Sequence, residues 1–150
     1  MRIPIKFIDL KGNYTNDYVE GIPVVLVDID VGFMPPSDPN AQFVPNFIQT
    51  HALVDTGANV TVISERITRG SLLRTVPAMN MLGQGYGGVY SALLNIIGDL
   101  RPLLLEVGTA KMRMDVVIGR DILSKLKLVI DTPVREFYLE RRIASAENSQ

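Results

Sequence analysis

The feature that most constrains this chain is a short acidic segment, residues 52–58, set between apolar stretches. It reads Ala-Leu-Val-Asp-Thr-Gly-Ala, and the alternating segment Val-Thr-Val-Ile-Ser follows at residues 60–64. This pattern predicts a tight turn between two buried strands, with Asp55 at its tip. A carboxylate there would be poorly solvated, unlike an ordinary surface charge. Gly57 would supply the backbone freedom for the turn. The Thr56 hydroxyl could point to the side of the turn and lock it by a hydrogen bond.

Three residues alone do not separate a functional loop from an ordinary β-turn, because Asp and Gly are common in both. Composition narrows the possible chemistry. The chain has no Cys and a single His, His51. Disulfides, thiolate metal sites, a cysteine nucleophile and a histidine metal cluster are therefore excluded. A serine–histidine triad would have only His51 as its base, and a lone histidine beside a strand is usually structural.

The totals indicate one soluble globular domain. Of the 150 residues, 47% are hydrophobic and 21% are charged, and the net charge is −1. This balance favours neither nucleic acid nor an anionic membrane surface as a partner. No apolar run reaches the roughly 20 residues of a membrane helix, and the charged, proline-containing start is unlike a signal peptide. We expect a cytoplasmic protein with one domain over residues 1–140 and a polar tail over 141–150.

Short strands and one or two short helices are predicted, which makes the fold all-β. Strands are expected at residues 3–10, 23–31, 47–54, 60–64, 89–94, 103–107, 112–118, 128–131 and 134–139. Ser64 would cap a short helix at 65–69, and a second helix would begin after Gly119. The segment 32–45 contains four prolines and can only be a loop. Residues 72–81 are ambiguous, and a turn is expected near Gly108.

A glycine-rich segment, Gly-Gln-Gly-Tyr-Gly-Gly, occupies residues 83–88. It matches the G-x-G-x-x-G pattern of dinucleotide-binding loops, which requires a preceding strand, a following helix and an acid about 20 residues on. Residues 77–82 are a poor strand, Val89 and Tyr90 favour a strand over a helix start, and Glu106 is the one acid near that distance. The alternative is a hairpin in which clustered glycines let the backbone bend. Such a hairpin could close over an extended peptide as a flap.

Three segments together resemble the retroviral-type aspartic proteases, the retropepsins and their cellular and bacterial relatives. Residues 52–64 are similar to the active-site loop of that family, and residues 83–89 to its glycine-rich flap. Residues 116–123, Val-Val-Ile-Gly-Arg-Asp-Ile-Leu, resemble the block that packs behind the catalytic loop. The matches follow the family order over about residues 22–140. The resemblance implies an all-β, retropepsin-like closed β-barrel-type domain with one or two short helices.

The resemblance also implies roles for the active-site loop. Asp55 would be the catalytic acid, Thr56 would lock two such loops together, and Gly57 and Ala58 would border the substrate backbone. The substrate would be an extended polypeptide, and no cofactor or metal is implied.

Bracing and flap residues follow from the same resemblance. Gly119 would let the chain pass close to the Asp55 turn, and Arg120 would brace that turn by hydrogen bonds. Asn59 stands where many viral members carry an acid that pairs with this arginine, so no ion pair is possible here. The flap would consist of Gly83, Gln84, Gly85, Tyr86, Gly87, Gly88 and Val89.

Counting carboxylates predicts a homodimer. Aspartic proteolysis uses two carboxylates that share one proton, because two like charges a few Å apart do not both ionise easily. Besides residues 55–57 no Asp-Thr-Gly or Asp-Ser-Gly occurs: Asp131-Thr132 is followed by proline, and Asp30 lacks the following hydroxyl. The second carboxylate would be Asp55 of a two-fold partner. The predicted function is an aspartic endopeptidase; a non-cleaving dimer that binds an extended segment, and nucleotide binding at residues 83–88, stay open as alternatives.

Overall fold

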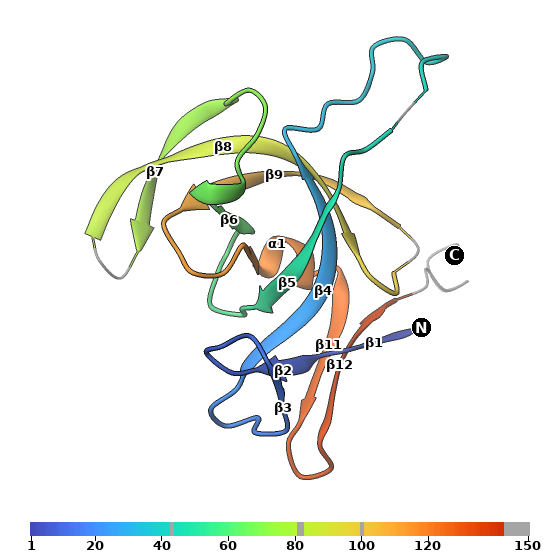
Figure 1. The fold of residues 1–150 in the computed structure, drawn as a ribbon, viewed down its shortest axis with the longest axis vertical. Helices are drawn as coiled ribbons and strands as arrows, with labels where there is room; N and C mark the ends of the chain where they lie inside the picture. The colour runs from blue at the N-terminus through green and yellow to red at the C-terminus, as the bar shows by residue number, and fades with distance from the viewer. Residues whose placement is uncertain (43, 81–82, 100, 143–150) are drawn as a thin grey trace, which may run out of the picture.

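The computed structural model describes residues 1–42, 44–80, 83–99 and 101–142, with the backbone alone at 78–80 and 83–86. Strands make up most of this part of the chain (Figure 1). In chain order they are β1 (Arg2–Pro4), β2 (Lys6–Ile8), β3 (Tyr14–Thr15), β4 (Ile22–Val31), β5 (Ile48–Val54), β6 (Val62–Ser64), β7 (Arg74–Asn80), β8 (Gly83–Ile96), β9 (Leu103–Ala110), β10 (Val116–Ile118), β11 (Leu126–Asp131) and β12 (Glu136–Arg141). Between them lie the 3-10 helix η1 (Glu65–Ile67) and the helix α1 (Arg120–Leu123).

Six of these strands close into a barrel. Their order is β4-β5-β10-β6-β9-β8, and the ring closes where β8 pairs with β4, for example at Leu94 and Ile29. The barrel interior is apolar because alternate side chains of each strand point inward. Its fully buried side chains include Val27, Ile29, Ala52, Leu94, Val107 and Val116. The predicted all-β, barrel-type domain with one or two short helices is confirmed.

The barrel brings two segments that are distant in sequence to one end. β5 and β10 run parallel, with Ala52 opposite Val116 and Val54 opposite Ile118. Parallel neighbours need a long crossover connection, and here the crossover includes β6 to β9. Both strands therefore end at the same edge, where the chain continues as the Asp55 loop and as the turn into α1.

A second sheet with the order β1-β12-β11 lies beside the barrel. Arg141, at the end of β12, donates three hydrogen bonds to the Asp99 carboxylate beyond β8, at 2.9, 3.1 and 2.6 Å. The Asp99 carboxylate raises the pKa of the Arg141 guanidinium above its usual value. Ile5 N donates to Phe137 O at 2.9 Å, and the rings of Phe7 and Phe137 pack edge to face with centroids 5.0 Å apart. These contacts fasten the second sheet to the barrel.

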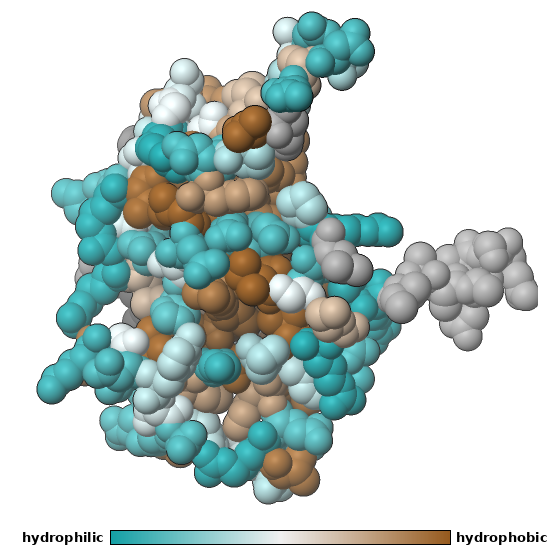
Figure 2. Space-filling view, turned by 45° about the vertical axis from the view of Figure 1, so that its right-hand side comes forward, coloured by the Kyte–Doolittle hydropathy of each residue, from teal (hydrophilic) through white to brown (hydrophobic). Residues whose placement is uncertain are grey.

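Two segments project from the barrel (Figure 1). One is the hairpin of β7 and β8. The other is the proline-rich loop between β4 and β5, and Figure 2 shows its tip as hydrophilic and clear of the body. The base of this loop is fixed by Asp30, whose carboxylate accepts the Asn46 N–H at 2.9 Å, and by Arg69, which donates to Asn46 O at 2.9 Å.

Two sequence predictions, the strand at 3–10 and the turn near Gly108, need correction, and the ambiguous residues 72–81 are now assigned. The expected strand at 3–10 is split into β1 and β2, because Pro4 has no N–H to continue a ladder and the chain passes from one sheet to the other. Residues 72–81 contain the edge strand β7, which tolerates Pro77 because an edge need not donate every hydrogen bond. Gly108 lies inside β9, not in a turn, since β6 and β8 both pair with it there.

The cap of η1 forms as predicted. Ser64 Oγ accepts the Arg66 N–H at 3.2 Å, but only a single 3-10 turn follows it. The expected strand at 60–64 is also shorter, beginning at Val62. Residues 60 and 61 instead belong to the loop that carries Asp55, and Thr61 makes its hydrogen bonds to Gly108, Gly119 and Asp121.

Candidate active site

Asp55 begins the loop at the end of β5. Its N–H donates to Ile118 O at 3.1 Å, which continues the contact with β10. Its side-chain oxygen Oδ1 accepts the Gly57 N–H at 2.8 Å. The other oxygen, Oδ2, receives no hydrogen bond from the described residues. The side chain is half-buried, where the sequence predicted a poorly solvated carboxylate. One carboxylate oxygen is held by a hydrogen bond, and the other receives none from the described residues.

The loop after Asp55 differs from expectation at Gly57. Its φ lies outside the left-handed region, so backbone freedom is not what requires glycine there. A Cβ on Gly57 would lie 3.1 Å from Asp55 Oδ1, tighter than nine in ten real contacts. The missing side chain therefore leaves room for the carboxylate. Thr56 and Gly57 are exposed and Ala58 is half-buried, so this part of the loop faces outward in the single chain.

Arg120, the first residue of α1, contacts the loop twice. Its Nη1 donates to Thr56 O at 3.0 Å, and its backbone N–H donates to Ala58 O at 2.8 Å. Asn59 is exposed, and no hydrogen bond joins it to Arg120 in the described part of the chain. The structure thus brings Arg120 to the loop and leaves Asn59 at its rim.

Gly119 lies directly beneath the loop. A Cβ at this position would be 2.4 Å from Val60 O and 3.0 Å from Ala58 O. Such distances are not possible between real atoms, so only glycine fits. The close approach expected from the sequence is present.

A hydrogen-bonded pair behind the loop, Thr61 and Asp121, was not predicted. The fully buried Thr61 donates from Oγ1 to Asp121 Oδ1 at 2.7 Å and from its N–H to Asp121 Oδ2 at 2.9 Å. Thr61 Oγ1 in turn accepts the Gly119 N–H at 3.2 Å. From the sequence, Asp121 is expected near the start of the helix after Gly119, and no partner in the loop is indicated for it. A signal was available, because a threonine within an apolar run needs a buried partner.

We expect Thr61→Val to lower the free energy of unfolding by about 2 kcal/mol. Valine keeps the shape but leaves the Gly119 N–H without its acceptor, and an unsatisfied buried group costs about 1–3 kcal/mol. It also removes one of the two hydrogen bonds to Asp121 Oδ1, which would keep only the one from the Ile122 N–H. Urea unfolding would measure the change. The matched control, Thr75→Val on the exposed edge strand β7, should stay within about 0.5 kcal/mol of wild type; equal effects of the two variants would contradict the role of this pair.

The glycine-rich segment forms the second strand of the β7–β8 hairpin. Gly83 pairs with Asn80 near the tip, and Gly88 pairs with Thr75 near the base. At the base, Gly88 N–H donates to Thr109 Oγ1, and Thr109 Oγ1 donates to Gly88 O, both at 3.1 Å. Val89 is buried. Among the described residues, these contacts anchor the base of the hairpin. The side chains of Gln84 and Tyr86 lie outside the described residues.

The structural context of a dinucleotide-binding loop is not met at this segment. The residues before it form a strand, β7, although the sequence indicated a poor one. The segment itself continues as β8 to Ile96, and no helix begins after it. The phosphate site of that motif depends on a helix N-terminus, so the glycines serve a hairpin here.

An ion pair between Arg74 and Glu106 connects the base of the hairpin to the barrel. Arg74 begins β7, Glu106 lies on β9, and the pair spans β8, with Arg74 Nη1 donating to Glu106 Oε1 at 3.1 Å. The hydrogen bond from Arg74 lowers the pKa of the exposed Glu106 carboxyl, and Glu106 raises the pKa of Arg74.

We expect this connection to weaken in acid. Because the folded-state pKa of Glu106 is lowered, its contribution is present above the usual Glu value of about 4.3 and is lost as pH falls through the lowered pKa. The difference in unfolding free energy between wild type and Glu106→Gln should therefore be constant near neutral pH and disappear in acid. Urea unfolding across this range measures it, and a difference that grows with acidity would contradict the assignment.

Other chemistries find little support in the described residues. His51 Nε2 and the Tyr14 hydroxyl are hydrogen-bonded at 2.8 Å, so the one histidine has a structural partner. No group of three or more His, Asp or Glu side chains is arranged to hold a metal ion in the described ranges. None of the helices described there combines the length and apolar character needed to cross a membrane.

Comparison with known proteins adds to this geometry. A family model described as retroviral aspartyl protease matches residues 22–131. The structure of EIAV protease complexed with the inhibitor HBY-793 is 20% identical and covers 77% of this chain and 100% of its own, with a TM-score of 0.55. A retropepsin-like aspartic protease from Rickettsia conorii is 12% identical and covers 94% of this chain and 91% of its own, with a TM-score of 0.49. No curated protein sequence matches the chain.

These findings confirm the resemblance noted from the sequence motifs. The matched range contains the Asp55 loop, the β7–β8 hairpin and the turn into α1, in the order expected. The likeness to EIAV protease shows that the barrel is retropepsin-like. Since the family model covers most of its length, the chain belongs to the retroviral aspartyl protease family.

Proposed function

We propose that this protein is an aspartic endopeptidase in which two Asp55 carboxylates, one from each subunit of a homodimer, activate the water that cleaves a peptide bond. Family membership and fold support aspartic protease activity in general. The observation that carries the finer proposal is the half-buried Asp55 carboxylate itself, with Oδ1 fixed by Gly57 and Oδ2 without a hydrogen bond from the described residues. This is half of the two-carboxylate site that such chemistry needs.

The other half has to come from a second chain. Asp121, the acid bonded to the loop, has both carboxylate oxygens engaged by Thr61 on the inner side. The exposed Thr56 and Gly57 leave the outer side of the loop free to meet a two-fold copy of itself. In that dimer, Thr56 would lock the two loops, and Arg120 would hold each one through Thr56 O and Ala58 O.

Catalysis then follows from one shared proton. The ionised Asp55 takes a proton from water, and the protonated Asp55 donates one to the peptide carbonyl, which gives a tetrahedral intermediate. The β7–β8 hairpin, with residues 83–89, would act as a flap that holds an extended substrate by main-chain hydrogen bonds and excludes water. The hairpin projects from the barrel (Figure 1) and is anchored at its base by Gly88 and Thr109, which supports such a movement.

The terminal strands would hold the dimer. β1 and β11 are the outer strands of the order β1-β12-β11, and each has a neighbour on one side only among the described residues. Outer strands carry unpaired N–H and C=O groups that can pair with another chain. The cytoplasm stays our predicted compartment.

The proposal is tested by incubating the protein with an unstructured protein at acidic and neutral pH, while sedimentation velocity reports its oligomeric state. We expect internal cleavage of the substrate protein. The cleavage rate per enzyme chain should fall when dilution dissociates the dimer. Binding of a labelled extended peptide without cleavage would favour the non-cleaving dimeric module instead. A strict monomer that cleaves nothing would overturn both.

A further inference from the structure

The start of the chain and the last hairpin enclose an open cleft of about 380 Å³. We name it the cationic cleft, and its walls include Lys6, Phe7, Tyr14, Tyr18, Arg135 and Phe137. The Arg135 guanidinium carbon lies 5.0 Å from the Tyr18 ring centroid, and Lys6 Nζ lies 5.0 Å from that of Tyr14. Neither cation forms an ion pair with a carboxylate within the described ranges. The cleft therefore presents two positive charges on aromatic walls.

Arg135 lies in this cleft with a left-handed backbone conformation. Its φ is +57°, and it is the one non-glycine residue with positive φ in the described part of the chain. Such a conformation is uncommon for a residue that has a side chain. Here Arg135 Nη2 donates to Asn16 O at 2.5 Å. This hydrogen bond and the contact with the Tyr18 ring hold the guanidinium at the cleft.

An acidic loop, residues 16–20, adjoins the cationic cleft. Its acids, Asp17 and Glu20, line a second hollow of about 360 Å³ together with Asp9 and Lys11, and Thr15 borders both hollows. Asp17 Oδ1 accepts the N–H groups of residues 19 and 20. Neither Asp17 nor Glu20 forms an ion pair in the described structure, even though Lys6 and Arg135 lie on the neighbouring cleft.

Apolar side chains are exposed on the same region. Val19 within the acidic loop is 79% exposed, Leu10 of the same second hollow is 78% exposed, and Val134 beside Arg135 is 61% exposed. Exposed apolar groups next to unpaired charges of both signs are the features of a protein–protein contact.

This region is also close to the catalytic loop. Leu53 lies opposite Val24. If this antiparallel register is continued by two residues, Asp55 comes opposite Ile22 of β4. Ile22 in turn pairs with Ile8 of β2. With strands about 4.8 Å apart, β2 is about 10 Å from the catalytic loop. The charged residues of the region, at 6, 17, 20 and 135, all lie outside the range matched by the family model.

We propose that this region binds a second copy of the chain, with the acidic loop of each copy seated in the cationic cleft of the other. A two-fold contact must be self-complementary, and neighbouring patches of opposite charge that do not pair within one chain satisfy that requirement. The proposal rests on the homodimer of the proposed function and assigns the residues that give it affinity and register. Opposite charges across the contact would also raise the association rate.

The test is a charge swap read by sedimentation velocity. Arg135→Glu and Glu20→Arg should each raise the dimer dissociation constant at least about tenfold, because each places like charges opposite one another. The double variant carries both reversals in each chain and should return close to the wild-type constant. Raising the salt concentration should weaken the wild-type dimer, because screening reduces the attraction.

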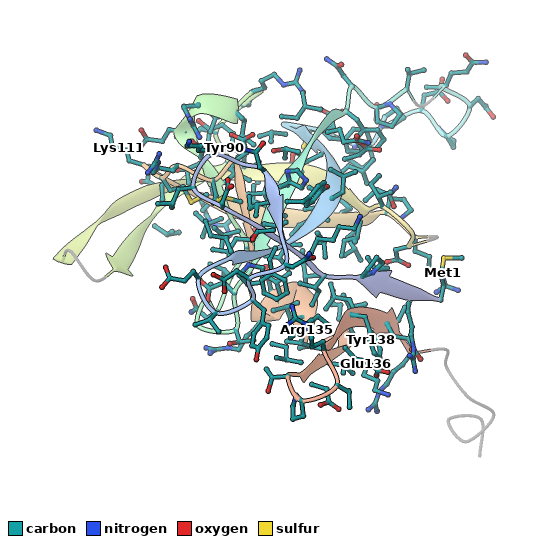
Figure 3. The ribbon with its side chains drawn as sticks, turned by 60° about the horizontal axis from the view of Figure 1, so that its bottom comes forward. Met1, Tyr90, Lys111, Arg135, Glu136 and Tyr138 are labelled. Carbon is teal, nitrogen blue, oxygen red and sulfur yellow. The ribbon has the colours of Figure 1, made fainter. Side chains whose placement is uncertain are left out.

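Controls separate folding from docking. Lys111→Glu makes the same charge reversal at the other end of the molecule from Arg135 (Figure 3) and should leave the dissociation constant unchanged. If Arg135→Glu unfolds, Lys6→Glu tests the same cleft. Unchanged dissociation constants in the single variants, or no recovery in the double variant, overturn this inference while wild-type dimerisation and cleavage still stand. Loss of cleavage with the dimer intact would instead overturn the proposed function alone.

Discussion

Asp55→Asn is expected to lower the rate of peptide cleavage at least about a thousandfold, because it removes the group that accepts and returns a proton. The fold should persist. An asparagine oxygen can still accept the Gly57 N–H that now binds Asp55 Oδ1 at 2.8 Å. The measurement is kcat/KM on a peptide that the wild type cleaves, with the circular dichroism spectrum and sedimentation compared at the same protein concentration.

A mixing experiment tests whether both carboxylates must be present in one dimer. With subunit exchange, a ninefold excess of Asp55→Asn would leave about a tenth of wild-type chains paired with wild type, and activity should fall about tenfold. The control is Asp38→Asn, the same change on the exposed proline-rich loop, which should not inhibit when mixed in. Activity that depends only on the amount of wild-type chain would show that a single Asp55 is sufficient.

Some of the site could be predicted because its determinants are local. The acidic turn at residues 55–57 follows from an apolar strand that meets turn residues, and Gly119 followed by a short helix follows from capping and charge preferences. The β4 and β5 strands were within a residue of their predicted bounds for the same reason.

What could not be predicted depends on residues far apart in sequence. The parallel pairing of β5 with β10 joins segments about 60 residues apart. The sequence of one segment does not indicate that the other is its partner. The Thr61–Asp121 pair exists only because that pairing is made. The division of residues 3–10 between two sheets likewise depends on where β12 lies. Even the role of Gly57, space for a carboxylate, required the position of Asp55 Oδ1.

Gly119→Ala is expected to lower the free energy of unfolding by about 3 kcal/mol or more, since its added carbon would lie 2.4 Å from Val60 O. Backbone conformation is not the cause, because Gly119 has φ −97°, which alanine adopts readily. The atoms in the way, those of Val60 and Ala58, are backbone atoms of the catalytic loop. The clash can therefore be relieved only if this loop moves away from α1. That movement would also stretch the bonds from Arg120 to Thr56 O and Ala58 O.

The matched control is Gly108→Ala, the same substitution at a glycine of the same barrel. Its added carbon would lie 3.9 Å from the Val62 side chain, an ordinary contact, so the change should stay within about 1 kcal/mol. Urea unfolding of both variants at one protein concentration measures the difference, because dimerisation makes stability depend on concentration. Equal losses of unfolding free energy in the two variants would mean that the catalytic loop moves away from α1 without a measurable cost. A selective loss at Gly119, with cleavage lost in parallel, would show that the close packing beneath the loop sets the position of Asp55.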